Sequence, residues 1–132
     1  MRGSHLVSLW SRTQQVISLS SAEAELNALC KSAQEGLAAK HLSEEIHLPV
    51  ALELKTDASA ARGVIQRQGA GKVKHLSVKQ LWVQEREACK ELSVKKIPRD
   101  FNPSDFLTHH CSESDLTRHL AGMSVVRRGF AT

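Results

Sequence analysis

Several residue types that mark particular classes of protein are scarce in this chain of 132 residues. It has no tyrosine and only 4% aromatic residues, so recognition of single-stranded nucleic acid by base stacking is not expected to be its main activity. The three cysteines form no CxxC pair and are odd in number, which favours reduced thiols and predicts an intracellular location, cytoplasmic or nuclear. No apolar run approaches the roughly 20 residues of a membrane span. No signal peptide is visible either, so a membrane is not an expected partner.

The residues that are abundant fit one small basic domain. Apolar residues make up 41% of the sequence, which is enough for a modest core, and the length leaves no room for a second core. The net charge is +4 and the pI is about 9.2, which suits a polyanionic partner without establishing one. We expect residues 1–5, MRGSH, to be an expression-vector leader or a chance start. The domain is then expected at 6–123, followed by a basic tail at 124–132.

The longest periodic segment is 21–47, where apolar side chains recur every three or four positions and predict an amphipathic helix. These apolar positions are Ala22, Leu26, Leu29, Cys30, Ala33, Leu37, Leu42 and Ile46. Ser20 followed by Glu23 is the pattern of a capping box at the start of this helix. Pro49 is expected to end it.

Alternating apolar residues and turn residues predict the remaining elements. Two short β-like runs precede the long helix, HLVSLW at 5–10 and VISLS at 16–20. After the helix, the patterns predict a strand at 50–57, a helix at 58–68, a helix at 75–91, a strand at 92–98 and a helical stretch at 112–120. The order of helix, strand, helix, helix, strand and helix is that of an α/β domain.

Three acidic residues lie where predicted elements meet. Glu25 is in the first turns of the long helix, Asp57 ends a strand, and Asp105 follows the turn at Asn102-Pro103. Ligands collect at the carboxyl ends of strands in α/β sheets, and carboxylates that converge there suit Mg²⁺, a hard ion that prefers oxygen. Each acid also has an ordinary structural interpretation, as a partner of the helix dipole, a strand-end cap or an N-cap. The spacing alone leaves both interpretations open.

A basic stretch surrounds the loop GAGKVK at 69–74. Its members are Arg62, Arg67, Lys72, Lys74, His75 and Lys79. They are candidates for phosphate contacts with a nucleic-acid duplex, which would be salt-dependent and independent of sequence. A solvated charged face is the alternative. The loop lacks the spacing of a Walker motif, so nucleotide binding is not indicated.

Other reactive or aromatic residues have ordinary explanations. One group near the C-terminus consists of His109, His110, Cys111 and His119. Its spacing fits no standard zinc finger, so a zinc site is not favoured. Trp82 lies near the apolar face of its helix with Val78 and Leu81, and is expected in the core rather than as a stacking platform. Cys30, on the apolar face of the long helix, is expected to pack in the core.

Four segments in this order carry a resemblance to a known family: SLWSRTQQVISLSSAEAEL, ELKTDASAA, GKVKHLSVKQLWVQE and KIPRDFNPSDFLT. Together they resemble the ribonuclease H domain at the C-terminal end of copia-type retrotransposon polyproteins, over about 6–123. The resemblance implies a ribonuclease H-like fold, in which helices flank a mixed sheet. It implies Mg²⁺- or Mn²⁺-dependent hydrolysis of the RNA strand in RNA–DNA hybrids at a two-ion site. By this resemblance Glu25, Asp57 and Asp105 are metal ligands, whereas Glu23 is the capping residue.

The sequence also departs from this family. The family's site has four acids, the first of them in the central first strand, and the printed sequence contains neither that acid nor the first two strands. THH at 108–110 replaces the usual Thr-Lys-Pro, and Ala58 stands where the family often has Asn. We therefore expect catalysis by this chain to be lost or nearly so, and the open sheet edge to permit self-association. The alternatives are a non-catalytic nucleic-acid-binding or interaction remnant, and a chain with no present function.

Overall fold

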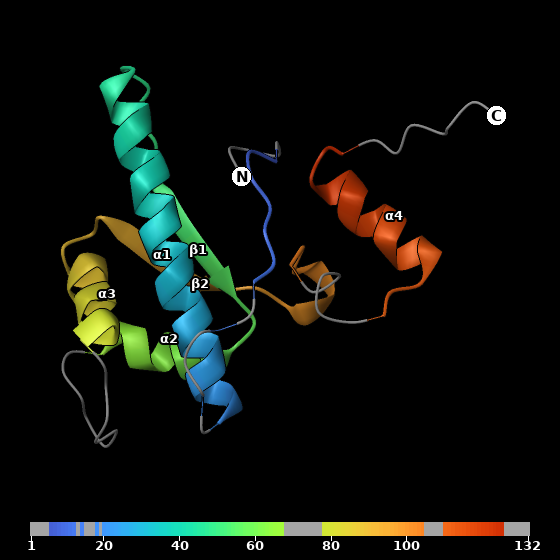
Figure 1. Cartoon of the computed structure of the whole chain (residues 1–132), viewed down its shortest axis with the longest axis horizontal. Helices are drawn as coiled ribbons and strands as arrows, with labels where there is room; N and C mark the ends of the chain where they lie inside the picture. Colours follow the sequence, from blue (N-terminus) through green and yellow to red (C-terminus); the bar gives the residue numbers. More distant parts are fainter. Residues whose placement is uncertain are drawn as a thin grey trace. The chain divides into compact units, whose positions relative to one another are not determined.

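The structure is a computed structural model that describes residues 6–12, 14, 18, 20–67, 78–104 and 110–125. The chain divides into two compact units, one of which is Gln14–Ile97. The other combines Met1–Thr13 with Pro98–Thr132. The described part is mixed α/β, as the sequence predicts, with four α-helices and one two-stranded parallel sheet (Figure 1).

Helix α1 spans Ser21–Glu45 and is the longest described element. The predicted N-cap is confirmed, because the Ser20 side chain accepts a hydrogen bond from the Glu23 backbone N–H at 3.2 Å. The buried positions are Leu26, Leu29, Cys30, Ala33 and Leu37. The predicted apolar stripe is too long at its end, because Leu42 and Ile46 are 61% and 60% exposed. The last two turns of α1 extend beyond the elements that cover its first half (Figure 1).

Strands β1 (Leu52–Thr56) and β2 (Leu92–Lys96) pair in parallel, with Leu52 opposite Leu92 and Thr56 opposite Lys96. Parallel strands need a long crossover, and here α2 (Ser59–Gln66) and α3 (Val78–Ala88) form the described part of it. Both strands alternate, so that Leu54, Thr56, Leu92 and Val94 are buried while Glu53, Lys55 and Lys95 are exposed. One face of the sheet is therefore covered by helices and the other carries charged residues.

The core of this unit lies between α1, α2, α3 and the covered face of the sheet. Ile65 and Val83 are its largest fully buried side chains, and Trp82 packs against the core from a half-buried position, as expected. The predicted apolar face of α3 is wrong in detail, because Val78 is 82% exposed and Leu81 is 40% exposed. Glutamines are buried instead, since hydrogen bonds such as that from Gln84 Nε2 to the Val64 carbonyl, 2.7 Å, satisfy their amides.

Three helices end in the same backbone motif on a residue other than glycine. His47, Lys90 and Ser124 have φ values of 59°, 60° and 56°. After α3, the Lys90 N–H donates to the Glu87 carbonyl and the Glu91 N–H donates to the Arg86 carbonyl, both at 3.0 Å. These two bonds define a Schellman motif, in which glycine is the usual residue at the left-handed position.

The second unit contains the 3₁₀ helix η1 (Arg99–Phe101) and α4 (Glu113–Gly122). Helix α4 begins where expected, with the Ser112 side chain accepting from the Asp115 N–H at 3.2 Å. The strand predicted at 5–10 is wrong over its described residues: 6–12 form no ladder, and a strand is stable only beside a partner. The run at 16–20 lies largely outside the described residues.

No helix in the described part of the chain is both long enough and apolar enough to span a membrane.

Candidate functional site

Asp57 lies where the chain passes from β1 into α2. The Thr56 carbonyl still accepts from the Ile97 N–H at 3.0 Å, so the sheet holds the strand up to this point. The buried Thr56 hydroxyl accepts from the Ala58 N–H at 3.1 Å, which fixes the turn around Asp57. Asp57 itself is half-buried, at the carboxyl end of the parallel pair. This is the end of an α/β sheet at which ligands bind.

The contact of α1 with the sheet fixes where Glu25 lies. A Cβ on Gly36 would be 2.8 Å from Leu52 Cδ1, so α1 and β1 are in contact at these two residues. This contact is the reference point for positions along both elements. Glu25 precedes Gly36 by eleven residues, about 16 Å along a helix. Asp57 follows Leu52 by five residues, about 16 Å along a strand. Because β1 runs back along α1 in the opposite direction (Figure 1), both acids reach the same level.

Helix geometry also gives the direction of Glu25. Eleven residues at roughly 100° per residue return to within about 20° of the starting direction. Glu25 and Gly36 therefore lie on the same side of α1, which is the side that faces β1. Glu25 is exposed and directly precedes Leu26, the first buried residue of α1. The structure thus brings the two predicted acids of this unit to the same end of the sheet.

The third predicted acid, Asp105, lies outside the described residues. Within the described ranges, no three His, Cys, Asp or Glu side chains gather closely enough to hold a metal ion. His110, Cys111 and His119 are described, whereas His109 is not. The geometry available for a metal site is therefore that of Glu25 and Asp57. Two carboxylates suit Mg²⁺, which keeps several of its waters.

Three members of the basic stretch predicted to contact nucleic acid are described, Arg62, Arg67 and Lys79, and Arg62 is half-buried on α2. Arg67 follows α2 and is half-buried, and its Nε atom is buried with no hydrogen-bond partner in the described structure. Lys79 is exposed in the first turn of α3. Lys72, Lys74 and His75 lie outside the described residues. The charged guanidinium of Arg67 suits a phosphate oxygen, but only through nitrogens other than the buried Nε, which a ligand cannot reach.

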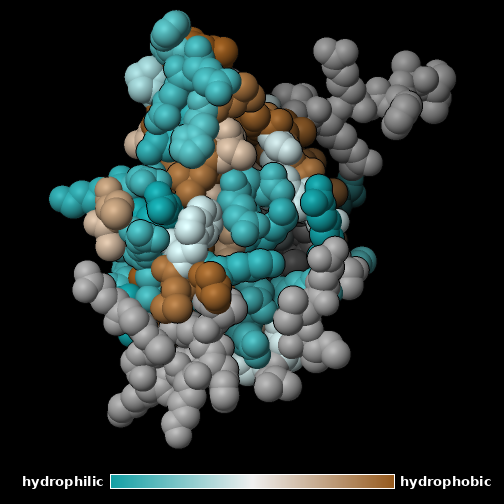
Figure 2. Space-filling model, turned by 60° about the vertical axis from the view of Figure 1, so that its left-hand side comes forward, coloured by the Kyte–Doolittle hydropathy of each residue, from teal (hydrophilic) through white to brown (hydrophobic). Residues whose placement is uncertain are grey.

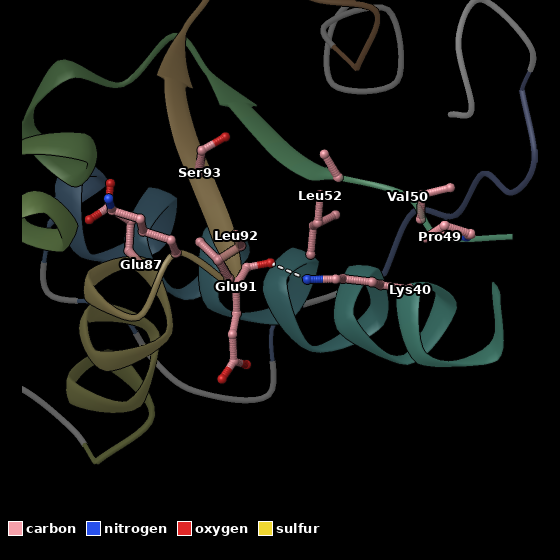
Figure 3. A pocket seen from close by; sticks show the side chains of 10 residues that line it. Lys40, Pro49, Val50, Leu52, Glu87, Glu91, Leu92 and Ser93 are labelled. Atoms are coloured by element: carbon pink, nitrogen blue, oxygen red, sulfur yellow. Dashed lines mark hydrogen bonds between the residues drawn. The ribbon is translucent and has the colours of Figure 1, made fainter. Parts of the chain in front are cut away.

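A pocket of about 590 Å³ lies at the opposite end of the sheet, where β1 and β2 begin (Figure 3). It is lined by Lys40, Pro49, Val50, Ala51, Leu52, Glu87, Lys90, Glu91, Leu92 and Ser93. Lys40 Nζ donates to the Glu91 carbonyl at 2.9 Å across it. The pocket contains none of the predicted site residues. Figure 2 shows brown, apolar surface beside the projecting end of α1.

Cys30 is buried at 3% exposure, as expected, and its Sγ faces the Lys79 carbonyl at 3.9 Å. Burial raises the pKa of the Cys30 thiol to about 11, against the smaller opposing effect of the Lys79 charge. The thiol is therefore protonated near neutral pH, and Cys30 is not a nucleophile in the folded chain.

Glu53 is a residue that sequence reasoning missed. On the exposed face of the sheet it forms ion pairs with Lys95 of β2 and with Lys55, the latter at 3.5 Å. The hydrogen bond from Lys95 lowers the pKa of Glu53, and both lysine charges act in the same direction. The alternation of LELKT could have placed Glu53 and Lys55 on one face. The pairing with Lys95 depends on the strand register.

No family model, no curated protein and no solved structure matches the chain.

Proposed function

We propose that this chain is a ribonuclease H-like domain of a copia-type retroelement, whose family reaction is metal-dependent hydrolysis of the RNA strand of RNA–DNA hybrids. The observation that carries the proposal is the position of Asp57 at the carboxyl end of the parallel β1–β2 pair, and the rise of α1 from its contact at Gly36 supports the same level for Glu25. The sequence resemblance assigns metal binding to these same two positions. The order α1, β1, α2, α3, β2 agrees with that assignment.

The residues present fit a divalent ion in part. Glu25 and Asp57 would supply carboxylate oxygens, and Asp105 is the third ligand that the resemblance assigns. Mg²⁺ binds through one or two carboxylates and its own waters, so this donor set suits the ion. When bound, such ions activate a water and stabilise the leaving oxygen of a phosphodiester. With one of the family's four acids unmatched in the printed sequence, we propose that hydrolysis by this chain alone is impaired.

Binding without cleavage is the second candidate function. The charges of half-buried Arg67 and exposed Lys79 favour phosphate contacts, and the net charge of +4 favours a polyanion. Contacts of this kind position a duplex without reading its sequence.

Metal binding is tested by titrating the chain with Mn²⁺ and following the free ion by electron paramagnetic resonance. Asp57→Asn and Glu25→Gln should each weaken Mn²⁺ binding by about tenfold, because each removes one of few charged ligands. The matched control is Asp100→Asn, which removes an exposed acid from η1 in the other unit. Equal Mn²⁺ affinity in Asp57→Asn and Asp100→Asn would contradict the proposed site.

Hybrid binding and cleavage are tested together on an RNA–DNA hybrid with a labelled RNA strand. Arg67→Ala and Lys79→Ala should each weaken binding and reduce its salt dependence by about one ion. Lys31→Ala is the control, since Lys31 pairs with Glu35 at 2.9 Å on α1. Binding without cleavage supports the second candidate. Cleavage that disappears in Asp57→Asn would show that the chain is active and that hydrolysis is not impaired.

A further inference from the structure

Strand β1 has one strand neighbour in the described structure, β2. A sheet of two strands is marginally stable, and an unpaired edge presents backbone N–H and C=O groups that can pair with another strand. The Leu54 and Thr56 side chains of β1 are buried against the helices and are not available to a partner. The edge offers backbone groups rather than a side-chain pocket, and so fits another strand.

The register identifies which backbone groups face this edge. The Ile97 N–H donates to the Thr56 carbonyl, and backbone groups alternate in direction along a strand. The N–H and C=O groups of Leu52, Leu54 and Thr56 therefore face β2. Those of Glu53 and Lys55 face the free edge, where no described residue pairs with them.

The outer edge of β2 is different, because a side chain occupies it. The same alternation turns the Val94 carbonyl away from β1. This carbonyl accepts a hydrogen bond from Gln66 Nε2 at 3.1 Å. A strand added beside β2 would have to displace Gln66, whereas no hydrogen bond within the described structure occupies the outward backbone groups of Glu53 and Lys55.

The charges of β1 select a second copy of β1 as the added strand. An antiparallel pair centred on Leu54 places each Glu53 opposite Lys55 of the second copy, and does so twice by symmetry. A centre on Glu53 would place two glutamates opposite each other, and a centre on Lys55 would place two lysines opposite each other. Of the three registers that bring the free backbone groups together, only the first pairs opposite charges.

Helix α1 permits the close approach that this pairing requires. Cys30 lies on the side of α1 that faces α3, because its Sγ contacts the Lys79 carbonyl. Ala28, Ser32 and Ala39 leave the helix on roughly the opposite side, and all three are exposed. Side chains this small allow two helices to approach closely above adjacent strands. Glu35, which pairs with Lys31, and the exposed Leu42 also lie toward this side of α1.

We propose that the chain forms a two-fold symmetric dimer in which β1 pairs antiparallel with β1 of a second copy, centred on Leu54. The sheet then runs β2, β1, β1, β2 across the two copies. On its exposed face, Glu53 lies between Lys95 of its own chain and Lys55 of the second copy. This assembly does not depend on metal binding or catalysis.

The wild-type chain tests the register directly by amide hydrogen exchange in reducing buffer at several protein concentrations. The amides of Leu54 and Thr56 bond to β2 and should be protected at every concentration. The amides of Glu53 and Lys55 should exchange freely in dilute solution and become protected, by about tenfold or more, as the dimer forms. Exchange of Glu53 and Lys55 that does not change with concentration would overturn the proposal.

Charge reversal tests the choice of register, with sedimentation velocity as the measurement. Glu53→Lys and Lys55→Glu should each weaken dimerisation by about tenfold, because each places like charges opposite one another twice. The double reversal should restore dimerisation, although the pair between Glu53 and Lys95 stays broken. Lys96→Glu is the matched control on β2 and should leave the dimer intact.

Three results would overturn the proposal: a wild-type chain that stays monomeric at every concentration, single reversals that leave the dimer unchanged, or a double reversal that fails to restore it. Circular dichroism of each variant identifies any that do not fold. If both single reversals fail to fold, the exchange of the wild-type amides decides.

Discussion

Replacing Lys90 by glycine should stabilise the unit Gln14–Ile97, because Lys90 holds a left-handed conformation with φ of 60°. That conformation costs a residue with a Cβ about 1–2 kcal/mol. Glycine avoids this strain but loses about 0.5–1 kcal/mol more conformational entropy on folding. The net expectation is a gain of about 0.5–1 kcal/mol in the free energy of unfolding.

The control for this prediction is Lys90→Ala, which removes the same side chain but keeps the Cβ. No ion pair of Lys90 is found in the described structure, and the residue is exposed. Lys90→Ala should therefore leave the stability within about 0.5 kcal/mol of the parent. The two variants together separate the backbone strain from any effect of the lysine charge.

The measurement is urea unfolding followed by the fluorescence of Trp82, which is half-buried against the core of this unit. A Trp10→Phe background makes Trp82 the sole tryptophan, since the chain has two. Lys90→Gly should raise the midpoint by roughly 0.3–0.7 M at unchanged slope and fixed protein concentration. Equal midpoints for Lys90→Gly and Lys90→Ala would refute the reasoning from backbone strain.

Three further predictions concern the core, the thiols and the response to acid. Ile65 is 1% exposed, so Ile65→Ala should lower the free energy of unfolding by about 2–5 kcal/mol and Ile65→Val by about 1 kcal/mol, as measured in urea; equal effects would contradict tight packing there. Alkylation at pH 8 followed by mass spectrometry should label the exposed Cys89 well before Cys30, whose thiol pKa is about 11; equally rapid labelling of Cys30 would show that it is accessible. The pKa of Glu53 is lower in the folded chain, so its stabilising contribution should be present above the unfolded pKa, near 4.5, and be lost as the pH falls through the lower folded value. Glu53→Gln should flatten that part of an acid-unfolding curve, and an unchanged curve would count against the pairing with Lys95.

Local signals in the sequence predict most of the elements. The start of α1 is readable because Ser20 and Glu23 form a cap within a few residues of each other. The strands are readable because their two faces differ in polarity. Both kinds of signal are complete within a short segment, so they do not depend on how the elements pack.

The errors arise where packing decides. The spacing of Leu42 and Ile46 continues the apolar stripe of α1, but the described elements of the unit end before reaching them. On α3 the apolar Val78 is exposed and the polar Gln84 is buried, because Gln84 finds a carbonyl of α2. A sequence pattern reports the polarity of a side chain and not the partners that reach it.

The candidate site is likewise predictable where a local pattern positions a residue, and not where the packing of distant segments does. The placement of Asp57 at a strand end follows from the alternation of the strand. The position of Glu25 along the sheet can be inferred only from the contact between Gly36 and Leu52, and no local sequence pattern predicts a contact between these two elements. The unpaired Nε of Arg67 likewise has no signal in the sequence, because it depends on what surrounds the end of α2.

The hydrogen bonds of Gln66 and Gln84 help to fix the positions of α2 and α3 relative to each other and to β2. One glutamine ties α2 to β2 through the Val94 carbonyl, and the other ties α3 to α2 through the Val64 carbonyl. Leucines of similar size would also fill these positions, but apolar contacts tolerate small shifts of one helix along another. Gln84 is buried, so a shift of α3 along α2 that breaks its hydrogen bond leaves a buried amide unsatisfied, whereas Gln66 is exposed and the loss of its bond costs less. The two hydrogen bonds thus disfavour alternative packings in which α2 or α3 is shifted along its neighbour, and they add little to the net free energy of unfolding.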